Sequence, residues 1–493
     1  MEAACSRLRK VVTAVLSHAY SRPGAGRMRL ESLGCEQLKT ADPAMPLVPI
    51  LTVAAAIAFQ EPAAAPPPEA VVLVMADDQG WGDVGLRDAS LRTPHLDALL
   101  RDGVELRRFY AAAPVCSPTR ASVLTGRHPA RMGIDGANVG HLHAEELHLG
   151  EVLGAAGWRT GFFGKWHLGT LTRDVVDSNR GGRPKHDAHH APPWAHGFDE
   201  CFATEAKVPT FDPMVDPNSG DAYGTRYWTG PAAVVSPDDL VGDDSALIVA
   251  RALEFIERCT AEGRPSLTVV WLHAPHEPVT RSPETLARLS LDPAAERDRY
   301  VACLADVDRQ VGALRAALEA RGRGVIWYCS DNGPEHGTGP GSTGGLRGRK
   351  RDLYEGGIRV PAALWWCGDA AVPLERGRPL DRPACTVDVL PTVLGIASVD
   401  VSLPRLDGRS LFTTAEAQPY GFRTRRQRAW IDGVWKIHSN DRGASWTLHH
   451  LGQDPAEARD LAKEESERLG RMVNAFAAWE RDVIADRAVP GPR

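Results

Sequence analysis

The sequence has little cysteine, no excess of basic residues and no apolar run long enough to cross a bilayer. Nine cysteines among 493 residues are too few for a disulfide scaffold. The 57 basic residues are outnumbered by 63 acidic ones, so the charge balance gives no argument for a nucleic-acid partner. The apolar run at residues 46–59 is shorter than the roughly 20 residues that a membrane helix needs. We therefore expect no membrane span and no nucleic-acid partner.

What the chain does contain is typical of a globular protein. Apolar residues make up 43% and charged residues 24% of the sequence, which is ordinary for a soluble domain. No internal repeat recurs at a fixed period, which argues against a solenoid. The length accommodates one large α/β domain and a smaller one. The 47 glycines and 37 prolines predict many turns.

The first 67 residues differ in character from the rest. The apolar run at residues 46–59 is followed by an Ala- and Pro-rich stretch, a pattern typical of a signal peptide with small residues after its core. A translation start at Met28 or Met45 would strengthen that interpretation, and a leader without regular structure is the alternative. We expect residues 1–67 to be a leader. We expect the mature protein to be periplasmic or extracellular, or otherwise cytoplasmic.

Three apolar segments each end in polar side chains that can bind ligands. They are typical of buried strands and cover Val71–Met75, Leu267–Leu272 and Val325–Cys329. Open α/β sheets place their active sites at the carboxyl ends of the strands. The polar residues that follow the three strands are therefore expected to meet at one edge of a sheet; they are Asp77, Asp78, His273, His276, Asp331 and Asn332.

The remaining sequence completes an α/β fold. Start and stop signals, such as Pro near the start and Gly at the end, predict helices at 93–103 and 147–157. Apolar residues at three- and four-residue spacing predict helices at 245–259 and 299–320, and a closing helix is expected at 463–486. Residues 171–235 are rich in Gly, Pro, His and Asp and predict a long irregular insertion. Alternating aromatic and polar residues at 420–450 predict a small antiparallel sheet. We expect a large central mixed sheet flanked by helices at 68–412, with a smaller C-terminal antiparallel-sheet subdomain at 413–493.

The segment from Cys116 to Arg127 has the features of an anion site. Ser117 and Pro118 are typical of a helix start, with Ser as the cap and Pro in the first turn. Cys116 would then lie just before a helix N-terminus, where free N–H groups and the helix dipole favour an anion. Arg120 would lie in the first turn, where its guanidinium can bind an oxyanion. From these features alone, a free thiol beside a capped helix is an equally good interpretation.

The same segment resembles the signature of a known enzyme family. Cys116, Pro118 and Arg120, followed by Leu124–Arg127, resemble the motif of formylglycine-dependent sulfatases. The resemblance implies that a formylglycine-generating maturation enzyme oxidises Cys116 to formylglycine. It also implies that the hydrated aldehyde is the nucleophile.

Further blocks resemble the same family in the same order. The match is strong over residues 68–412 and weak beyond them. The blocks are Ala76–Asp83, Gly164–Gly169, His196–Glu200, Ala274–Pro278, Ser330–Pro334, Leu346–Lys350 and Tyr354–Gly357.

The residues at two strand ends form a set of metal ligands. Asp77, Asp78 and Asp331 supply carboxylate oxygens and Asn332 supplies a carbonyl oxygen, which suits Ca²⁺ or Mg²⁺. Cysteine and histidine are absent from this set of oxygen donors, which argues against zinc. The resemblance implies one Ca²⁺, with the converted Cys116 as a further ligand.

The resemblance also implies roles for the charged side chains. Arg120 and the metal would hold and polarise the hydrated formylglycine at position 116. Lys165 and Lys350 would neutralise the sulfate oxygens as charge spreads in the transition state. Lys350 lies in a basic stretch, so a solvated loop is the alternative interpretation of that residue.

Two histidines complete the implied mechanism. His276 would be the general acid that protonates the departing alcohol, and His167 would deprotonate the second hydroxyl of the hydrated formylglycine. His273 could share or take the role of His276. Alternation along an extended chain directs the two side chains to opposite sides, and this favours His276.

Three functions are compatible with the sequence. The first is hydrolysis of sulfate monoesters of an aryl or carbohydrate substrate. The second is hydrolysis of phosphonate or phosphate esters, because related families share the fold and the metal site. The third is an inactive relative that binds glycans. The sequence does not specify the sulfated small molecule or glycan.

Overall fold

The computed structural model describes residues 67–487, apart from 281, 337–339, 371, 404 and 414–417. The fold lies within the compact unit Ala65–Arg493. Apart from Pro67, the expected leader lies outside the described residues. No helix in the described part of the chain is long and apolar enough to cross a membrane.

A nine-stranded mixed sheet forms the centre of the fold, as the sequence predicts. Its order is β2-β10-β9-β1-β8-β4-β5-β6-β7. The five strands from β9 to β5 pair in parallel, and the strands at both margins pair antiparallel. The parallel strands are β1 (Ala70–Ala76), β4 (Arg159–Lys165), β5 (Glu200–Thr204), β8 (Ser266–Trp271) and β9 (Gly324–Ser330). The marginal strands are β2 (Val104–Glu105), β6 (Tyr227–Gly230), β7 (Ala233–Val234) and β10 (Ala362–Trp366).

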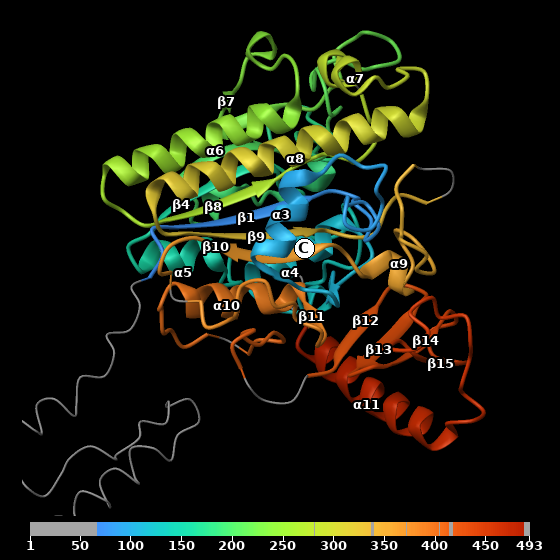
Figure 1. The fold of residues 1–493 in the computed structure, drawn as a ribbon. Coiled ribbons are helices and arrows are strands. Elements are labelled where there is room, and N and C mark those ends of the chain that lie inside the picture. The colour runs from blue at the N-terminus through green and yellow to red at the C-terminus, as the bar shows by residue number, and fades with distance from the viewer. Residues whose placement is uncertain are drawn as a thin grey trace, which may run out of the picture. The chain divides into compact units, whose positions relative to one another are not determined.

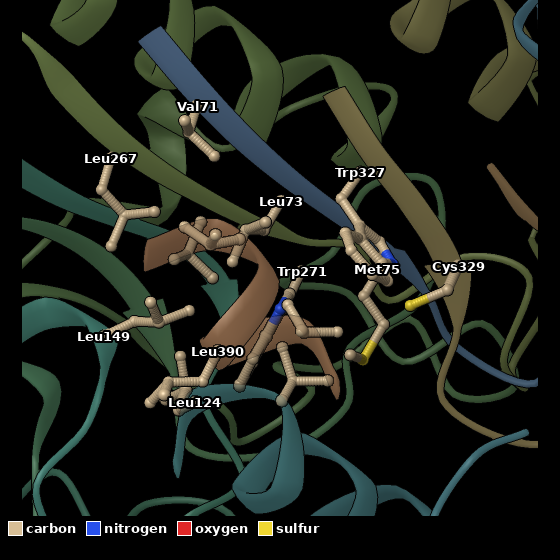
Figure 2. Packing of buried hydrophobic residues seen from close by; sticks show 14 of the residues in the cluster. Val71, Leu73, Met75, Leu124, Leu149, Leu267, Trp271, Trp327, Cys329 and Leu390 are labelled. Atoms are coloured by element: carbon tan, nitrogen blue, oxygen red, sulfur yellow. The ribbon is translucent and has the colours of Figure 1, made fainter. Parts of the chain in front are cut away.

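Helices cover both faces of the sheet (Figure 1). One face is covered by α3 (Pro94–Asp102), α6 (Asp244–Ala261) and α8 (Glu296–Arg321). The other is covered by α4 (Cys116–Thr125), α5 (Leu149–Ala155) and α10 (Val389–Ile396). Alternate residues of β1 point to the two faces: Val72 and Val74 pack toward α3, α6 and α8. Leu73 and Met75 belong to the cluster on the other face, part of which Figure 2 shows together with Leu390 of α10. Burial on both faces explains why the central strands are continuously apolar.

A smaller sheet follows the large domain in the chain. Its strands are β12 (Tyr420–Arg423), β13 (Arg428–Asp432), β14 (Trp435–Ser439) and β15 (Thr447–His450), and all pair antiparallel. Helix α11 (Ser466–Ala485) packs on it through Met472 and Phe476. Short elements complete the fold: β3 (Phe109–Tyr110), which pairs with β11 (Ala384–Cys385), and helices α7 (Pro283–Leu289) and α9 (Glu355–Ile358). The expected C-terminal antiparallel sheet is confirmed.

A buried group of charges joins the small sheet to the large domain. Lys436 Nζ on β14 lies 3.1 Å from Glu355 Oε1 and 3.0 Å from Glu457 Oε1, and all three side chains are fully buried. Glu457 also accepts a 2.6 Å hydrogen bond from the backbone N–H of Glu355. The Tyr110 hydroxyl donates to Glu355 Oε2 at 3.0 Å. Two carboxylates thus share one ammonium group at this junction.

The expectation of an irregular insertion at 171–235 is wrong in part. The segment contributes β5, β6 and β7, which extend the main sheet at one edge. Asp177 fixes the loop before them, because its carboxylate accepts a 2.6 Å hydrogen bond from the Trp228 indole. These strands are two to five residues long and lie among glycines and prolines, so no periodic pattern announces them.

Candidate active site

Two neighbouring strands bring the predicted metal ligands together. In the parallel register of β1 and β9, Ala76 lies beside Ser330, so the residues that follow each strand are level. The backbone N–H of Asp78 donates to Asp331 Oδ1 at 3.1 Å. The Asn332 amide donates to Asp78 Oδ1 at 2.6 Å. All four predicted oxygen donors, Asp77 included, are buried.

Helix α4 places Cys116 against this carboxylate cluster. The Cys116 sulfur lies 3.6 Å from Asp77 Oδ1, and the residue is 2% exposed. Burial raises the pKa of the Cys116 thiol, and the negative charge of Asp77 adds to that effect. The expectation that Ser117 caps the helix is wrong. The helix begins at Cys116 itself with Val115 as the cap residue, and Ser117 Oγ instead accepts a 3.4 Å hydrogen bond from the Asn138 N–H.

Three cations surround the cluster. Arg120 is fully buried, with Nη2 2.9 Å from Asp331 Oδ2 and 3.3 Å from Asp77 Oδ2. The Lys165 ammonium contacts Asp77 Oδ2. Lys350 donates to Asp78 Oδ2 at 2.7 Å. Figure 1 shows that α4 and α9, whose N-terminus follows the Lys350 loop, are separate elements of the fold. The site is therefore assembled from segments that are far apart in the sequence.

The nearby cations affect the pKa values of Asp77 and Asp331 differently. Burial raises the pKa of Asp77, but the charges of Lys165, His276, Arg120 and Lys350 outweigh burial and hold it well below its usual value. Burial and the charge of Asp77 instead raise the pKa of Asp331 to about 7. Closely spaced carboxylates cannot all ionise without compensation. Asp77 and Asp331 therefore differ in how strongly the protein cations favour their ionised forms.

The two candidate acid residues point to different surroundings. His276 Nε2 lies 3.5 Å from Asp78 Oδ2 at the cluster. His273 is fully buried away from it, with Nδ1 2.8 Å from Asp244 Oδ2 and Nε2 2.7 Å from Thr204 Oγ1. The structure thus brings His276, and not His273, to the predicted site residues.

His167 lies two residues after the end of β4. It is 5% exposed, and its Nε2 lies 3.0 Å from Asn138 Oδ1. Burial lowers the pKa of His167 well below its usual value, and the positive charges of Lys165 and Arg120 lower it further. The imidazole is therefore neutral at neutral pH.

Sequence reasoning missed two side chains of this site. Asn138 contacts His167 as described above, and Glu335 Oε2 lies 3.3 Å from Lys350 Nζ. Glu335 directly follows the block Ser330–Pro334, so its position in the chain was a usable signal. Asn138 lies in a Gly-rich loop whose sequence carries no comparable signal.

The donor set fits a divalent cation that prefers oxygen. Ligand atoms of Asp77, Asp78, Cys116 and His276 lie within 4.8 Å of one another. Asn332 Oδ1 is buried and accepts no hydrogen bond within the part of the chain that the structure describes. A buried carbonyl oxygen without a donor is costly, and a bound cation would satisfy it. Asp77, Asp78 and Cys116 thus belong both to the ligand set predicted from the sequence and to this group of four neighbouring side chains.

Fold and site together define a hydrolase that acts on anionic esters, and comparison with known proteins narrows this class. The sulfatase family model matches residues 69–399. N-acetylgalactosamine-6-sulfatase of Rattus norvegicus is 27% identical over 89% of this chain and 90% of its own. Arylsulfatase G of the same species is 32% identical over 85% of this chain and 88% of its own. The crystal structure of Ps i-CgsB in complex with k-i-k-neocarrahexaose has a TM-score of 0.71 at 24% identity, covering 86% of this chain and 94% of that one.

The family match spans well over half of the chain and contains every predicted site residue. The protein therefore belongs to the sulfatase family of the alkaline phosphatase superfamily. It is accordingly a sulfuric ester hydrolase.

Proposed function

We propose that this enzyme hydrolyses sulfate monoesters of a carbohydrate, with formylglycine formed from Cys116 as its nucleophile and one Ca²⁺ as its metal. The observation that carries the proposal is the position of Cys116 at the start of α4, 3.6 Å from a carboxylate that three cations face. The names of N-acetylgalactosamine-6-sulfatase and of the structure in complex with k-i-k-neocarrahexaose favour a sugar as substrate.

The metal would be held by Asp77, Asp78, Asp331 and Asn332, together with position 116. These are hard oxygen donors, which Ca²⁺ prefers, and the unpaired carbonyl of Asn332 supports the assignment. When bound, Ca²⁺ would supply the positive charge that lowers the pKa of a coordinated hydroxyl.

The protein cations would bind the sulfate group. Arg120, Lys165 and Lys350 reach the cluster from three separate segments. Sulfate esters carry a single negative charge that spreads over their oxygens in the transition state. Preorganised cations in a buried site stabilise such charge without reorganisation. Arg120 also fixes the Lys165 backbone, since its Nη1 donates to the Lys165 carbonyl at 3.0 Å.

The two histidines would move protons. His276 would protonate the departing alcohol as a general acid, because it lies at the cluster beside Asp78. His167 would accept a proton from the nucleophilic centre, because the lowered pKa leaves its imidazole neutral. The alcohol and the sulfate are then released in separate steps.

Maturation and location complete the proposal. A formylglycine-generating enzyme of the host would convert Cys116, and the mature protein would be periplasmic or extracellular. Residues 1–67 would act as the export signal, residues 68–412 would carry catalysis, and residues 413–493 would form the C-terminal subdomain.

The test is a paired measurement on protein purified from its native host. Peptide mass spectrometry should find formylglycine at position 116, and the same sample should release sulfate from sulfated monosaccharides. Cys116→Ala should abolish turnover. Cys259→Ala is the matched control, because Cys259 is also buried but lies near the end of α6, beside Arg159 at the start of β4. An active sample whose Cys116 remains a thiol would refute the mechanism.

A comparison of substrates distinguishes sulfate ester hydrolysis from phosphonate or phosphate ester hydrolysis. Sulfate, phosphate and phosphonate esters of one sugar and one aryl alcohol should be compared at equal concentration. Higher kcat/KM for the sugar sulfate supports the proposal, and higher kcat/KM for a phosphonate ester supports the alternative. Binding of sulfated sugar without turnover by converted protein would indicate the inactive relative.

A further inference from the structure

The ring of His167 has two nitrogens in different surroundings. Nε2 lies 3.0 Å from the side-chain carbonyl oxygen of Asn138. Nδ1 is buried and has no hydrogen-bond partner among the residues that the structure describes. The backbone N–H of His167 donates to the Glu205 carbonyl at 3.1 Å, and its φ is 56°. The ring is thus fixed from the backbone and from Nε2, and Nδ1 remains available.

The hydrogen bond to Asn138 decides which nitrogen carries the proton. A neutral imidazole has one N–H donor and one lone-pair acceptor. Since a carbonyl oxygen only accepts, Nε2 must carry the hydrogen and Nδ1 must carry the lone pair. Reversing the Asn138 amide would leave an N–H at the buried Nδ1 without an acceptor, which costs about 1–3 kcal/mol. The observed orientation is therefore the more stable one.

Asn138 is itself held in place from two sides. Its φ is 60°, a conformation that non-glycine residues rarely adopt. Arg180 Nη1 donates to the backbone carbonyl of Asn138 at 3.3 Å and to the backbone carbonyl of Gly140 at 2.9 Å. The Asn138 N–H donates to Ser117 Oγ at 3.4 Å, directly after Cys116. These contacts maintain a backbone conformation that would otherwise be strained.

The supporting contacts form a closed ring. Arg180 is 3% exposed, and its backbone N–H donates to Glu205 Oε1 at 3.1 Å. Glu205 in turn accepts the His167 N–H, and His167 contacts Asn138. Four residues from separate loops are thereby linked around one imidazole. Such outer partners commonly set the tautomer and orientation of a functional histidine.

We propose that Asn138 is a positioning residue that fixes His167 as the Nε2–H tautomer, so that Nδ1 is the nitrogen that accepts the proton. The inference rests on the proposed role of His167. Asn138 itself does not touch the reacting atoms. Arg180 holds the loop of Asn138, and Glu205 holds the backbone of Arg180 and of His167.

The decisive variant is Asn138→Asp, which is nearly isosteric and can only accept. It should keep kcat within a few fold of wild type at its own optimum. The added negative charge should raise the pKa of His167, so the rising limb of the kcat–pH profile should move to higher pH. The charged groups that already face His167 are Lys165, Arg120, Asp77 and Arg180, and the variant leaves them unchanged. Asn474→Asp is the matched control, because Asn474 is exposed on α11.

Asn138→Leu removes the acceptor and should lower kcat while leaving KM nearly unchanged. A general base contributes about 10²–10⁴-fold, and we expect the misplaced imidazole to lose roughly 10-fold or more of that. An Asn138→Asp variant that melts like wild type but is as inactive as Asn138→Leu would overturn the proposal. So would an Asn138→Asp profile that does not move, or an Asn138→Leu variant with wild-type kcat.

A spectroscopic measurement keeps this inference separate from the proposed function. Long-range ¹⁵N correlation spectra of histidine-labelled enzyme report the tautomer of each ring without turnover, and a His167→Gln sample assigns the signal. A protonated Nε2 supports the inference even if the enzyme fails to hydrolyse sulfate esters. A protonated Nδ1 contradicts it even if sulfatase activity is established.

Discussion

Replacing Lys436 by methionine should destabilise the protein by about 3 kcal/mol. Removing one partner of a buried ion group typically costs ~3–5 kcal/mol, because the other charge is left uncompensated. Two carboxylates depend on this one ammonium, at 3.1 Å for Glu355 and 3.0 Å for Glu457. Burial already raises the pKa of Glu457 to about 7, against the opposing charge of Lys436, so this group can take up a proton. We therefore expect the lower end of the range.

Guanidinium-induced unfolding at pH 8 measures the effect. Lys463→Met, at an exposed position, is the control and should change the free energy of unfolding by less than about 0.5 kcal/mol. The double variant Lys436→Met with Glu457→Gln should recover part of the loss, because it removes one uncompensated charge. A Lys436→Met protein within about 1 kcal/mol of wild type would refute the reasoning that the group depends on this ammonium.

Three further predictions test other parts of the structure. Glu457→Gln should flatten the pH dependence of stability. Folding raises the pKa of this carboxyl from 4.5 to about 7, so the group contributes stability below pH 4.5 that is lost as the pH rises through 7. Melting temperatures of wild type and variant that change equally between pH 5 and 8 would contradict this. Asn332→Ala should weaken Ca²⁺ binding in calorimetric titration of the converted enzyme, whereas unchanged affinity would remove Asn332 from the ligand set. Leu124→Ala, fully buried on α4, should lower the free energy of unfolding by about 2–5 kcal/mol, and chemical denaturation showing a loss below 1 kcal/mol would contradict the packing described here.

The parts of the fold that sequence predicted are those with a strong local signal. The central strands are apolar on both faces because helices cover both sides. Continuous apolar runs such as Val71–Met75 therefore indicate strands that are buried on both faces. Apart from His273, the polar residues after the three strands meet because parallel strands share a carboxyl edge. Helix lengths were close, as with α6, because apolar spacing marks the buried stripe. The small antiparallel sheet was found through its alternation.

The parts that escaped depend on contacts distant in sequence. The predicted cap at Ser117 is wrong because Ser117 Oγ accepts from the Asn138 backbone N–H, a partner that no local pattern specifies. The role of Asn138 can be recognised only from the hydrogen bonds that link it, through Arg180 and Glu205, to His167. The short strands β5, β6 and β7 are defined by pairing along the sheet from β4 outward, and not by a strong local preference of their own. In each case tertiary context overrides a weak local preference.

The C-terminal subdomain holds the loop that carries Lys350. The family match ends at residue 399, yet the loop that carries Lys350 is held from beyond it. Gln427 Oε1 accepts the Leu353 N–H at 2.7 Å, and Gln427 Nε2 donates to the Arg351 carbonyl at 3.1 Å. Arg347 Nη1 donates to the Glu457 carbonyl at 3.0 Å.

Contacts on both sides of Lys350 therefore come from the subdomain. A lysine on a flexible stem reaches Asp78 reproducibly only if its backbone is fixed. Loss of these contacts should for that reason weaken the sulfate binding that we propose for Lys350.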